Sequence, residues 1–159
     1  MTSMNVSTAS PPESRAFPAI FVGGLIAGAV DLLYAIAVYS PRHPILVPQT
    51  IASGILGPES YQGGMDSALL GVVLQFVIAL GAATVYYLAS RKLKFLVTRA
   101  VLCGLIYGAL VYLFMHVVVV PLSAAPHGHT PLLYKVLEFV QHWFVVGLPI
   151  ALSVRHYSR

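Results

Sequence analysis

Apolar residues fall into four long runs that are separated by polar or proline-containing segments. The runs cover roughly residues 17–39, 68–88, 97–120 and 131–152. About 20 consecutive apolar residues cross the hydrocarbon core of a bilayer as a helix, so each run predicts a transmembrane helix. Pro41 and Pro121 follow the first and third runs, and proline normally stops a helix. The pattern predicts an all-α, four-helix transmembrane bundle with a single transmembrane domain over residues 17–155.

Two segments outside the runs differ from them in composition. Residues 1–16 are mostly small and polar, which is typical of a disordered tail. Residues 49–56 form a short, mostly apolar piece inside a long connection that contains several prolines. This piece is too short to span a bilayer, so we expect it to lie as a short helix at the outer interface or to dip in as a re-entrant turn.

Composition places the chain in lipid rather than in water. Of its 159 residues, 58% are hydrophobic and 9% are charged, and the mean hydropathy is +0.83. A soluble domain carries about 25% charged residues, so this chain lacks the polar side chains to cover a water-facing surface. Its net charge of +4 is small, and its basic residues are not clustered as phosphate-backbone binding requires. The lipid bilayer is therefore the expected partner, a second copy or another membrane protein is left open, and nucleic acid is excluded.

The basic residues indicate the orientation of the spans. Most of them lie in the connection between the second and third runs or in the C-terminal tail: Arg91, Lys92, Lys94, Arg99, Arg155 and Arg159. The other two connections hold little more than Arg42 and Lys135. Because short cytoplasmic loops carry an excess of Lys and Arg, we expect both termini and the middle connection to face the cytoplasm.

The two halves of the chain resemble each other. A shift of 80 residues places Gly24 and Gly28 on Gly104 and Gly108, and a shift of 63 residues aligns the second run with the fourth. This match predicts duplication of a two-helix hairpin, with the halves as parallel repeats about an axis along the membrane normal. Since small residues four apart allow close backbone approach, these glycines predict packing of helices one and three near that axis.

Six strongly polar side chains form a candidate intramembrane site. They are Asp31, Gln75, His116, Glu138, Gln141 and His142. With the predicted topology, all of them fall in the outer half of the bilayer, and such residues usually face a bundle interior. The repeat alignment makes Gln75 equivalent to Glu138, so we expect these two side chains to face one another.

The candidate site has both structural and functional interpretations. Asp31 could accept hydrogen bonds from a tyrosine or from helix ends, and Glu138 could pair with Lys135. Imidazole and carboxylate groups also suit Zn or Fe, so a metal or haem site is a minor alternative, although no cofactor is predicted. The loop residues His127 and His129 are expected to titrate in water rather than bind metal.

Five pieces of the sequence resemble a known group. They are GGLIAGAVDLLYA, IASGILG with YQGG after it, YYLASRKLKFL, VVPLSAAP and VGLPIAL. In this order and spacing they resemble an uncharacterised family of small four-helix bacterial inner-membrane proteins. The resemblance covers most of the chain beyond residue 17. It implies a bacterial inner-membrane location and no particular activity.

Three functions remain open from the sequence. The first is a non-enzymatic small membrane subunit or accessory protein, in which the buried polar groups are structural. The second is a transporter or channel-like carrier that uses the polar cluster. The third is a metal- or haem-binding membrane protein.

Overall fold

The protein is all-α in the part that the structure describes. This computed structural model describes residues 15–126, 128 and 131–158, and no strand occurs among them. Four helical stretches are long and apolar enough to cross a membrane: Ala16–Tyr39, Gly64–Lys92, Ala100–Leu122 and Leu132–Tyr157. The predicted all-α membrane bundle is confirmed. Of the predicted tail, residues 1–14 lie outside the described residues, and the first helix begins at Ala16.

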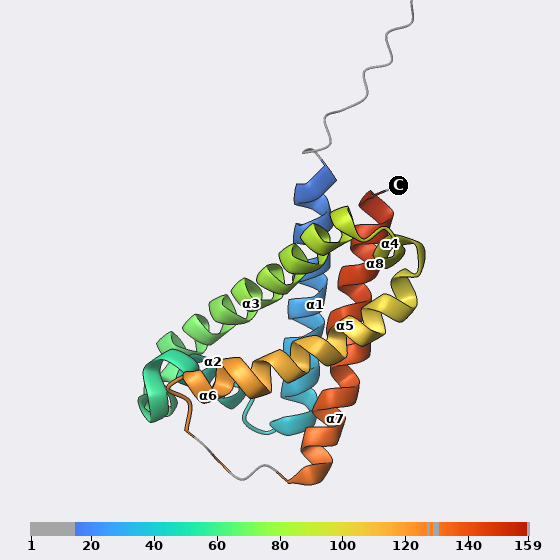
Figure 1. The fold of residues 1–159 in the computed structure, drawn as a ribbon. Helices are drawn as coiled ribbons and strands as arrows, with labels where there is room; N and C mark the ends of the chain where they lie inside the picture. The colour runs from blue at the N-terminus through green and yellow to red at the C-terminus, as the bar shows by residue number, and fades with distance from the viewer. Residues whose placement is uncertain (1–14, 127, 129–130, 159) are drawn as a thin grey trace, which may run out of the picture.

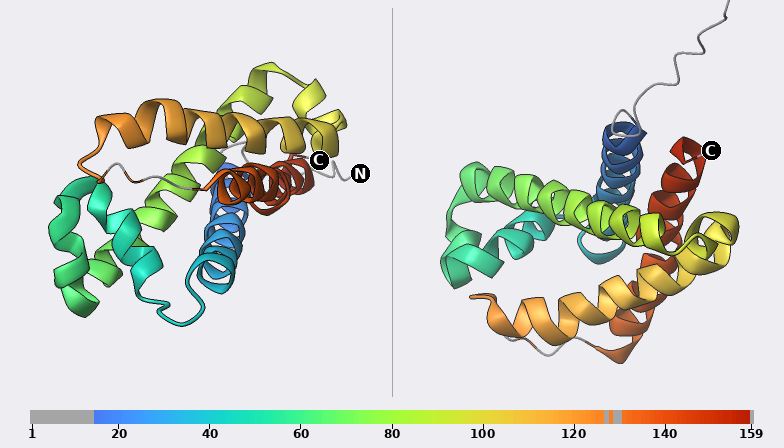
Figure 2. Two further views of the ribbon diagram at one scale, coloured as in Figure 1. Left: turned by 90° about the horizontal axis from the view of Figure 1, so that it is seen from below. Right: turned by 45° about the horizontal axis from the view of Figure 1, so that its top comes forward.

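Two upright spans and two oblique spans make up the bundle. In chain order, the first span is the helix α1 (Ala16–Tyr39) and the second is the helix α3 (Gly64–Lys92). The third is composed of α5 (Ala100–Phe114), η3 (Met115–Val119) and α6 (Val120–Leu122). The fourth is composed of α7 (Leu132–His142), η4 (Trp143–Gly147) and α8 (Leu148–Tyr157). In Figure 1, α1 stands beside α7 and α8, while α3 and α5 cross them obliquely. The view from below in Figure 2 shows the fourth span lying between α5 and the nearly end-on α1.

Each of the last two spans contains a turn of π-helix just ahead of a proline. The turn η3 ends two residues before Pro121, and η4 ends two residues before Pro149. Proline lacks an N–H and its ring clashes with the carbonyl four residues earlier, so widening the preceding turn lets the helix continue. Pro121 was expected to stop the third helix, but the helix runs on to Leu122. Pro41 behaves as expected, because α1 ends at Tyr39.

The long connection between α1 and α3 folds back onto α3. It contains α2 and the 3₁₀ turn η2, which cover Leu46–Leu56 and Gly57–Gln62. Gln49 Nε2 donates to the carbonyl oxygen of Gly64 over 3.0 Å. The carbonyl of Pro48 lies so close to Gly71 that a Cβ at that position would collide with it. The short piece predicted at 49–56 is therefore a helix that starts three residues earlier and packs on α3.

The large apolar side chains mostly point outward. Leu33, Val117 and Phe144 are 66%, 69% and 54% exposed, whereas the buried core is built from alanines, tyrosines and a few branched residues such as Ile150. Exposed apolar surface of this extent is costly in water and favourable in lipid, and small residues at helix interfaces are typical of membrane bundles. The molecule is therefore built for contact with a bilayer.

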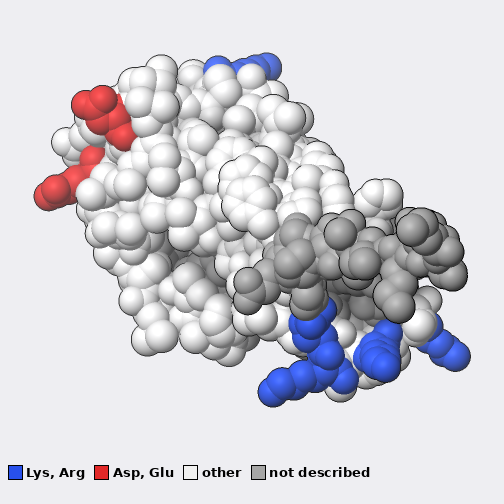
Figure 3. Space-filling model, turned by 90° about the horizontal axis from the view of Figure 1, so that it is seen from above, with Lys and Arg blue, Asp and Glu red and all other residues white. Residues whose placement is uncertain are grey.

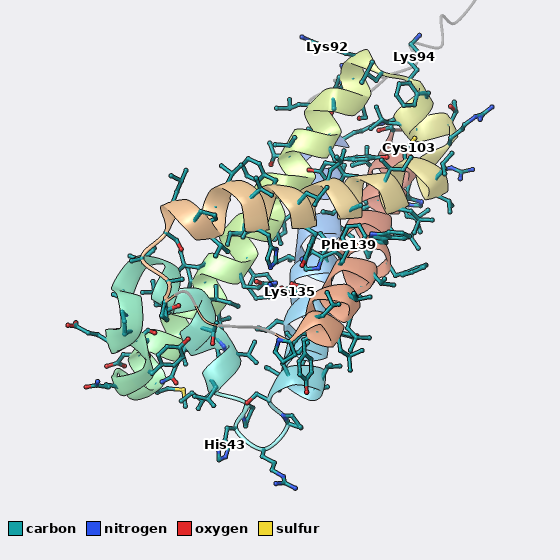
Figure 4. The ribbon with its side chains drawn as sticks, turned by 60° about the horizontal axis from the view of Figure 1, so that its bottom comes forward. His43, Lys92, Lys94, Cys103, Lys135 and Phe139 are labelled. Atoms are coloured by element: carbon teal, nitrogen blue, oxygen red, sulfur yellow. The ribbon has the colours of Figure 1, made fainter. Side chains whose placement is uncertain are left out.

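Charge separates the two ends of the molecule. Most Lys and Arg side chains gather on one side of the face shown in Figure 3, and Asp and Glu side chains lie at the opposite side. The basic end contains the short helix α4 (Phe95–Thr98), which joins α3 to α5. Figure 4 shows Lys92 and Lys94 at this end, whereas His43 lies at the far end of the bundle.

The glycine pairs join different helices from those predicted. Gly24 and Gly28 pack on α3, where a Cβ at Gly28 would lie 3.0 Å from the Phe76 ring. Gly104 and Gly108 pack on the fourth span, where a Cβ at Gly104 would lie 3.0 Å from the Gly147 carbonyl oxygen. The predicted packing of helix one on helix three through these glycines is wrong. Small residues allow close approach to whichever helix is adjacent, and here that is the next span in the chain.

Candidate functional site

Asp31 is the centre of a polar cluster that connects three spans. Its carboxylate oxygen Oδ2 accepts a hydrogen bond from Gln75 Nε2 on α3 over 2.7 Å. The other oxygen, Oδ1, accepts from Gln141 Nε2 on α7 over 3.0 Å. Gln75 Nε2 also lies 3.5 Å from the Gly28 carbonyl oxygen on α1. We call Asp31, Gln75 and Gln141 the carboxylate–amide cluster.

The position of Asp31 explains why these glutamines reach it. Asp31 lies three residues after Gly28, whose missing side chain lets α3 approach α1 closely. Gln141 is only 7% exposed, and it enters the bundle from the last turn of α7. The donors to the Asp31 carboxylate are therefore two side-chain amides, rather than the expected tyrosine or helix ends.

Glu138 belongs to a second cluster, with His116. Its Oε2 lies 3.5 Å from His116 Nε2, and the two side chains are 31% and 35% exposed. The ion-pair partner of Glu138 is thus His116, and the alternative pairing of Glu138 with Lys135 is not formed. The expectation that Gln75 faces Glu138 is also wrong, because Gln75 bonds Asp31 and Glu138 bonds His116.

The two histidines make the same local contact. His116 Nδ1 lies 3.1 Å from the carbonyl oxygen of Tyr112, and His142 Nδ1 lies 2.6 Å from that of Glu138. A carbonyl oxygen only accepts, so Nδ1 carries the hydrogen in both rings. The neutral form of His116 then presents a lone pair at Nε2 to a carboxylate. With an ionised Glu138, the pair is therefore attractive only when the imidazole is protonated.

Tyr112 lies between the two histidines and was not among the predicted site residues. Its ring stacks on His116 at a centroid distance of 4.0 Å and meets His142 edge-on at 5.4 Å. Its hydroxyl donates to the carbonyl oxygen of Lys135 over 3.3 Å. The spacing of four residues between Tyr112 and His116 could have indicated this contact, since such residues share a helix face.

Some buried polar atoms near the clusters have no hydrogen-bond partner among the described residues. They include Gln141 Oε1, the Tyr39 hydroxyl and Trp143 Nε1. In addition, Gln141 Nε2 lies 3.4 Å from His142 Nδ1, but both atoms carry hydrogen, so this contact is not a hydrogen bond. The carboxylate–amide cluster is thus not linked by hydrogen bonds to His142.

The arrangement of ligating groups does not form a metal cage in the described part of the chain. No group of three or more His, Cys, Asp or Glu side chains is positioned there to hold a metal ion. Zinc sites normally use three or four protein ligands, and His116 with Glu138 provides two. The loop residues His127 and His129 lie outside the described residues.

Comparison with known proteins gives no relative from which roles could be transferred. No family model, no curated protein and no solved structure matches this chain.

Proposed function

We propose that this chain is a non-enzymatic, multi-pass protein of the bacterial inner membrane that acts as a small subunit or accessory protein, with both termini in the cytoplasm. The observation that carries the proposal is the carboxylate–amide cluster. Both oxygens of Asp31 are occupied by amides from two other spans. Such bonds hold helices together, and interhelical side-chain hydrogen bonds are a common stabilising device in membrane bundles.

The chemistry of the cluster supports a structural role over proton transfer. A relay needs each member both to accept and to release a proton. The amides of Gln75 and Gln141 do not titrate, and the contact from Gln141 Nε2 to His142 Nδ1 joins two donors. Asp31 therefore has no titratable side chain bonded to it among the described residues.

A small bundle with its polar groups joined internally has apolar faces left for assembly. Leu69, Val73 and Val77 on α3 are 57%, 58% and 59% exposed. In a bilayer these faces contact lipid, a second copy or another membrane protein. An accessory role is consistent with such a surface, because the chain contributes packing area rather than a reacting group.

Two substitutions at Asp31 test the proposal. Asp31→Leu leaves two amides without their acceptor, and we expect a loss of about 2–3 kcal/mol in the free energy of unfolding. Asp31→Asn should cost less than half of this, because Gln141 can turn its unpaired Oε1 toward the new amide. The measurement is reversible unfolding in mixed micelles. The control is Asp66→Asn in the first turn of α3, away from the cluster.

Two outcomes would contradict the proposal. A stable, folded Asp31→Leu variant would show that the cluster does not hold the spans together. If the purified protein, reconstituted into vesicles, moved protons and Asp31→Asn alone abolished that flux, the chain would be a carrier instead.

A carrier is the second candidate, and the exposed pair of His116 and Glu138 is the observation that favours it. Both side chains are about one-third exposed, and ionisable groups inside a membrane often mark ion pathways. Proton flux into vesicles that is lost in Glu138→Gln but kept in Asp31→Asn would favour this function.

A further inference from the structure

A shallow hollow lies at the basic end of the bundle, far from the two polar clusters. Its volume is about 370 Å³, and it lies where the turn between α4 and α5 faces the last turns of α8. It is lined by Thr98, Arg99, Ala100, Val101, Leu102, Leu105 and Arg155. Figure 1 shows α4, the start of α5 and the end of α8 meeting at this corner of the molecule.

Two guanidinium groups line this hollow, one from the turn between α4 and α5 and one from α8. Arg99 immediately precedes α5, and Arg155 lies in the last turn of α8. Neither forms an ion pair with a described Asp or Glu side chain. Planar guanidinium groups match phosphate oxygens in pairs, so the hollow suits an anion with two or more oxygens.

The rest of the lining is apolar and exposed. Val101 and Leu102 are 50% and 53% exposed, and Leu105 continues this wall along α5. Thr98 provides no additional donor, because its hydroxyl already donates to the Phe95 carbonyl oxygen over 3.3 Å. A free inorganic anion would therefore bind the two guanidinium groups alone, because the apolar wall offers it no polar contact.

From this combination of charge and apolar wall we infer that the hollow binds an anionic phospholipid. The phosphodiester lies between Arg99 and Arg155, and an acyl chain runs along the wall formed by Val101, Leu102 and Leu105. Basic pockets between membrane helices on the cytoplasmic side recognise such headgroups. This inference is independent of the function of the carboxylate–amide cluster.

The direct test measures lipid retained by the full-length chain. Purified protein in mixed micelles is titrated with dioleoylphosphatidylglycerol, and bound lipid is counted by native mass spectrometry. We expect the double variant Arg99→Gln/Arg155→Gln to bind about tenfold more weakly or worse, since each basic residue near the surface contributes favourably to anionic lipid binding. The matched control is Arg91→Gln/Lys92→Gln, which removes the same charge from the last turn of α3.

The outcomes separate a built site from general attraction to basic residues. A less than twofold change in the control, beside the tenfold loss in the double variant, supports the site. Equal losses in both pairs would overturn it, because charge at this end would then act without a defined position. Circular dichroism and unfolding of each variant confirm that the bundle is intact.

Two further ligands test whether binding requires the net negative charge of the headgroup and whether it requires the acyl chains. Dioleoylphosphatidylcholine at the same concentrations should bind at least tenfold more weakly than the anionic lipid. Inorganic phosphate should neither stabilise the protein nor displace the lipid at millimolar concentration. Displacement by inorganic phosphate would overturn the proposal, because the apolar wall would then contribute nothing.

Discussion

The two hairpins of this bundle pack in different ways. In the first hairpin, the space at Gly28 is bounded by side chains alone, the Phe76 ring and the Ala79 methyl group, whereas a Cβ at Gly24 would also lie 3.0 Å from the Leu80 Cα. In the second, α5 meets the fourth span backbone to backbone, where Gly108 lies against the carbonyl of His142 and Gly147 lies against that of Gly104. A side chain can adjust its position, whereas a backbone carbonyl in a helix cannot.

The second hairpin also contains both π turns. The turns η3 and η4 belong to the third and fourth spans, while α1 and α3 are regular over their whole length. The close glycine contacts between α5 and η4 thus coincide with a locally widened helix. We therefore expect the two hairpins, although matched in sequence pattern, to differ in tolerance to substitution.

The largest expected effect is at the glycines. Gly108→Ala places a methyl group against a backbone carbonyl, and we expect it to lower the free energy of unfolding by about 3 kcal/mol or more. Gly28→Ala meets a movable ring at 3.0 Å, so its cost should be about 1 kcal/mol. Unfolding in mixed micelles measures both. Equal losses would show that the two hairpins pack alike.

The next effect distinguishes the two amides of the carboxylate–amide cluster. Gln75→Leu removes the short bond to Asp31 at 2.7 Å, and we expect a loss of about 2 kcal/mol. Gln141→Leu removes a bond of 3.0 Å but also an unpaired buried oxygen. Its net effect should stay below about 1 kcal/mol, because these two terms oppose each other. A larger loss for Gln141→Leu than for Gln75→Leu would contradict this ranking.

A smaller effect is expected from removing a proline. Pro149→Ala restores an N–H to α8, so η4 can close into a regular α-helix, with a stability change of about 1 kcal/mol or less. Amide hydrogen exchange should slow across Trp143–Gly147 and stay unchanged in α3. The control is Pro18→Ala in the first turns of α1, a helix that contains no π turn. Unchanged exchange in η4 would show that the proline does not cause the π turn.

The smallest effect is expected from the pair of His116 and Glu138. Its side chains are 35% and 31% exposed, so a double-mutant cycle with alanine should give a coupling of about 0.5 kcal/mol. The attraction requires protonated His116, so the coupling should weaken as the pH rises. A coupling that grows as the pH rises would contradict the assigned hydrogen on Nδ1.

Sequence could predict the spans but not the partners within them. Run length alone determines whether a helix crosses a bilayer, which is why the four spans were predicted within a few residues. Partner choice depends on helix rotation and tilt. Gln75 was assigned to Glu138 by assuming a symmetry axis between helices one and three, whereas α1 actually packs between α3 and α8.

The π turns are a second reason why contacts between the spans could not be predicted from the sequence. Each one adds a residue to a turn, which rotates the helix faces before and after it relative to a regular helix. His116 lies inside η3, and His142 directly precedes η4. The position of side chains after each π turn, relative to those before it, therefore could not be derived from regular helical spacing. The predicted duplication itself remains a prediction.

The partners of Asp31 have a consequence for biogenesis. Its two donors lie 44 and 110 residues later in the chain. At a synthesis rate of about 5–20 residues per second, Gln75 follows Asp31 out of the ribosome after roughly 2–9 s, and Gln141 after roughly 5–22 s. During that interval the first helix carries a carboxylate that has no amide to bond. Its residence at the insertion machinery should therefore outlast that of a purely apolar helix, until the later spans arrive.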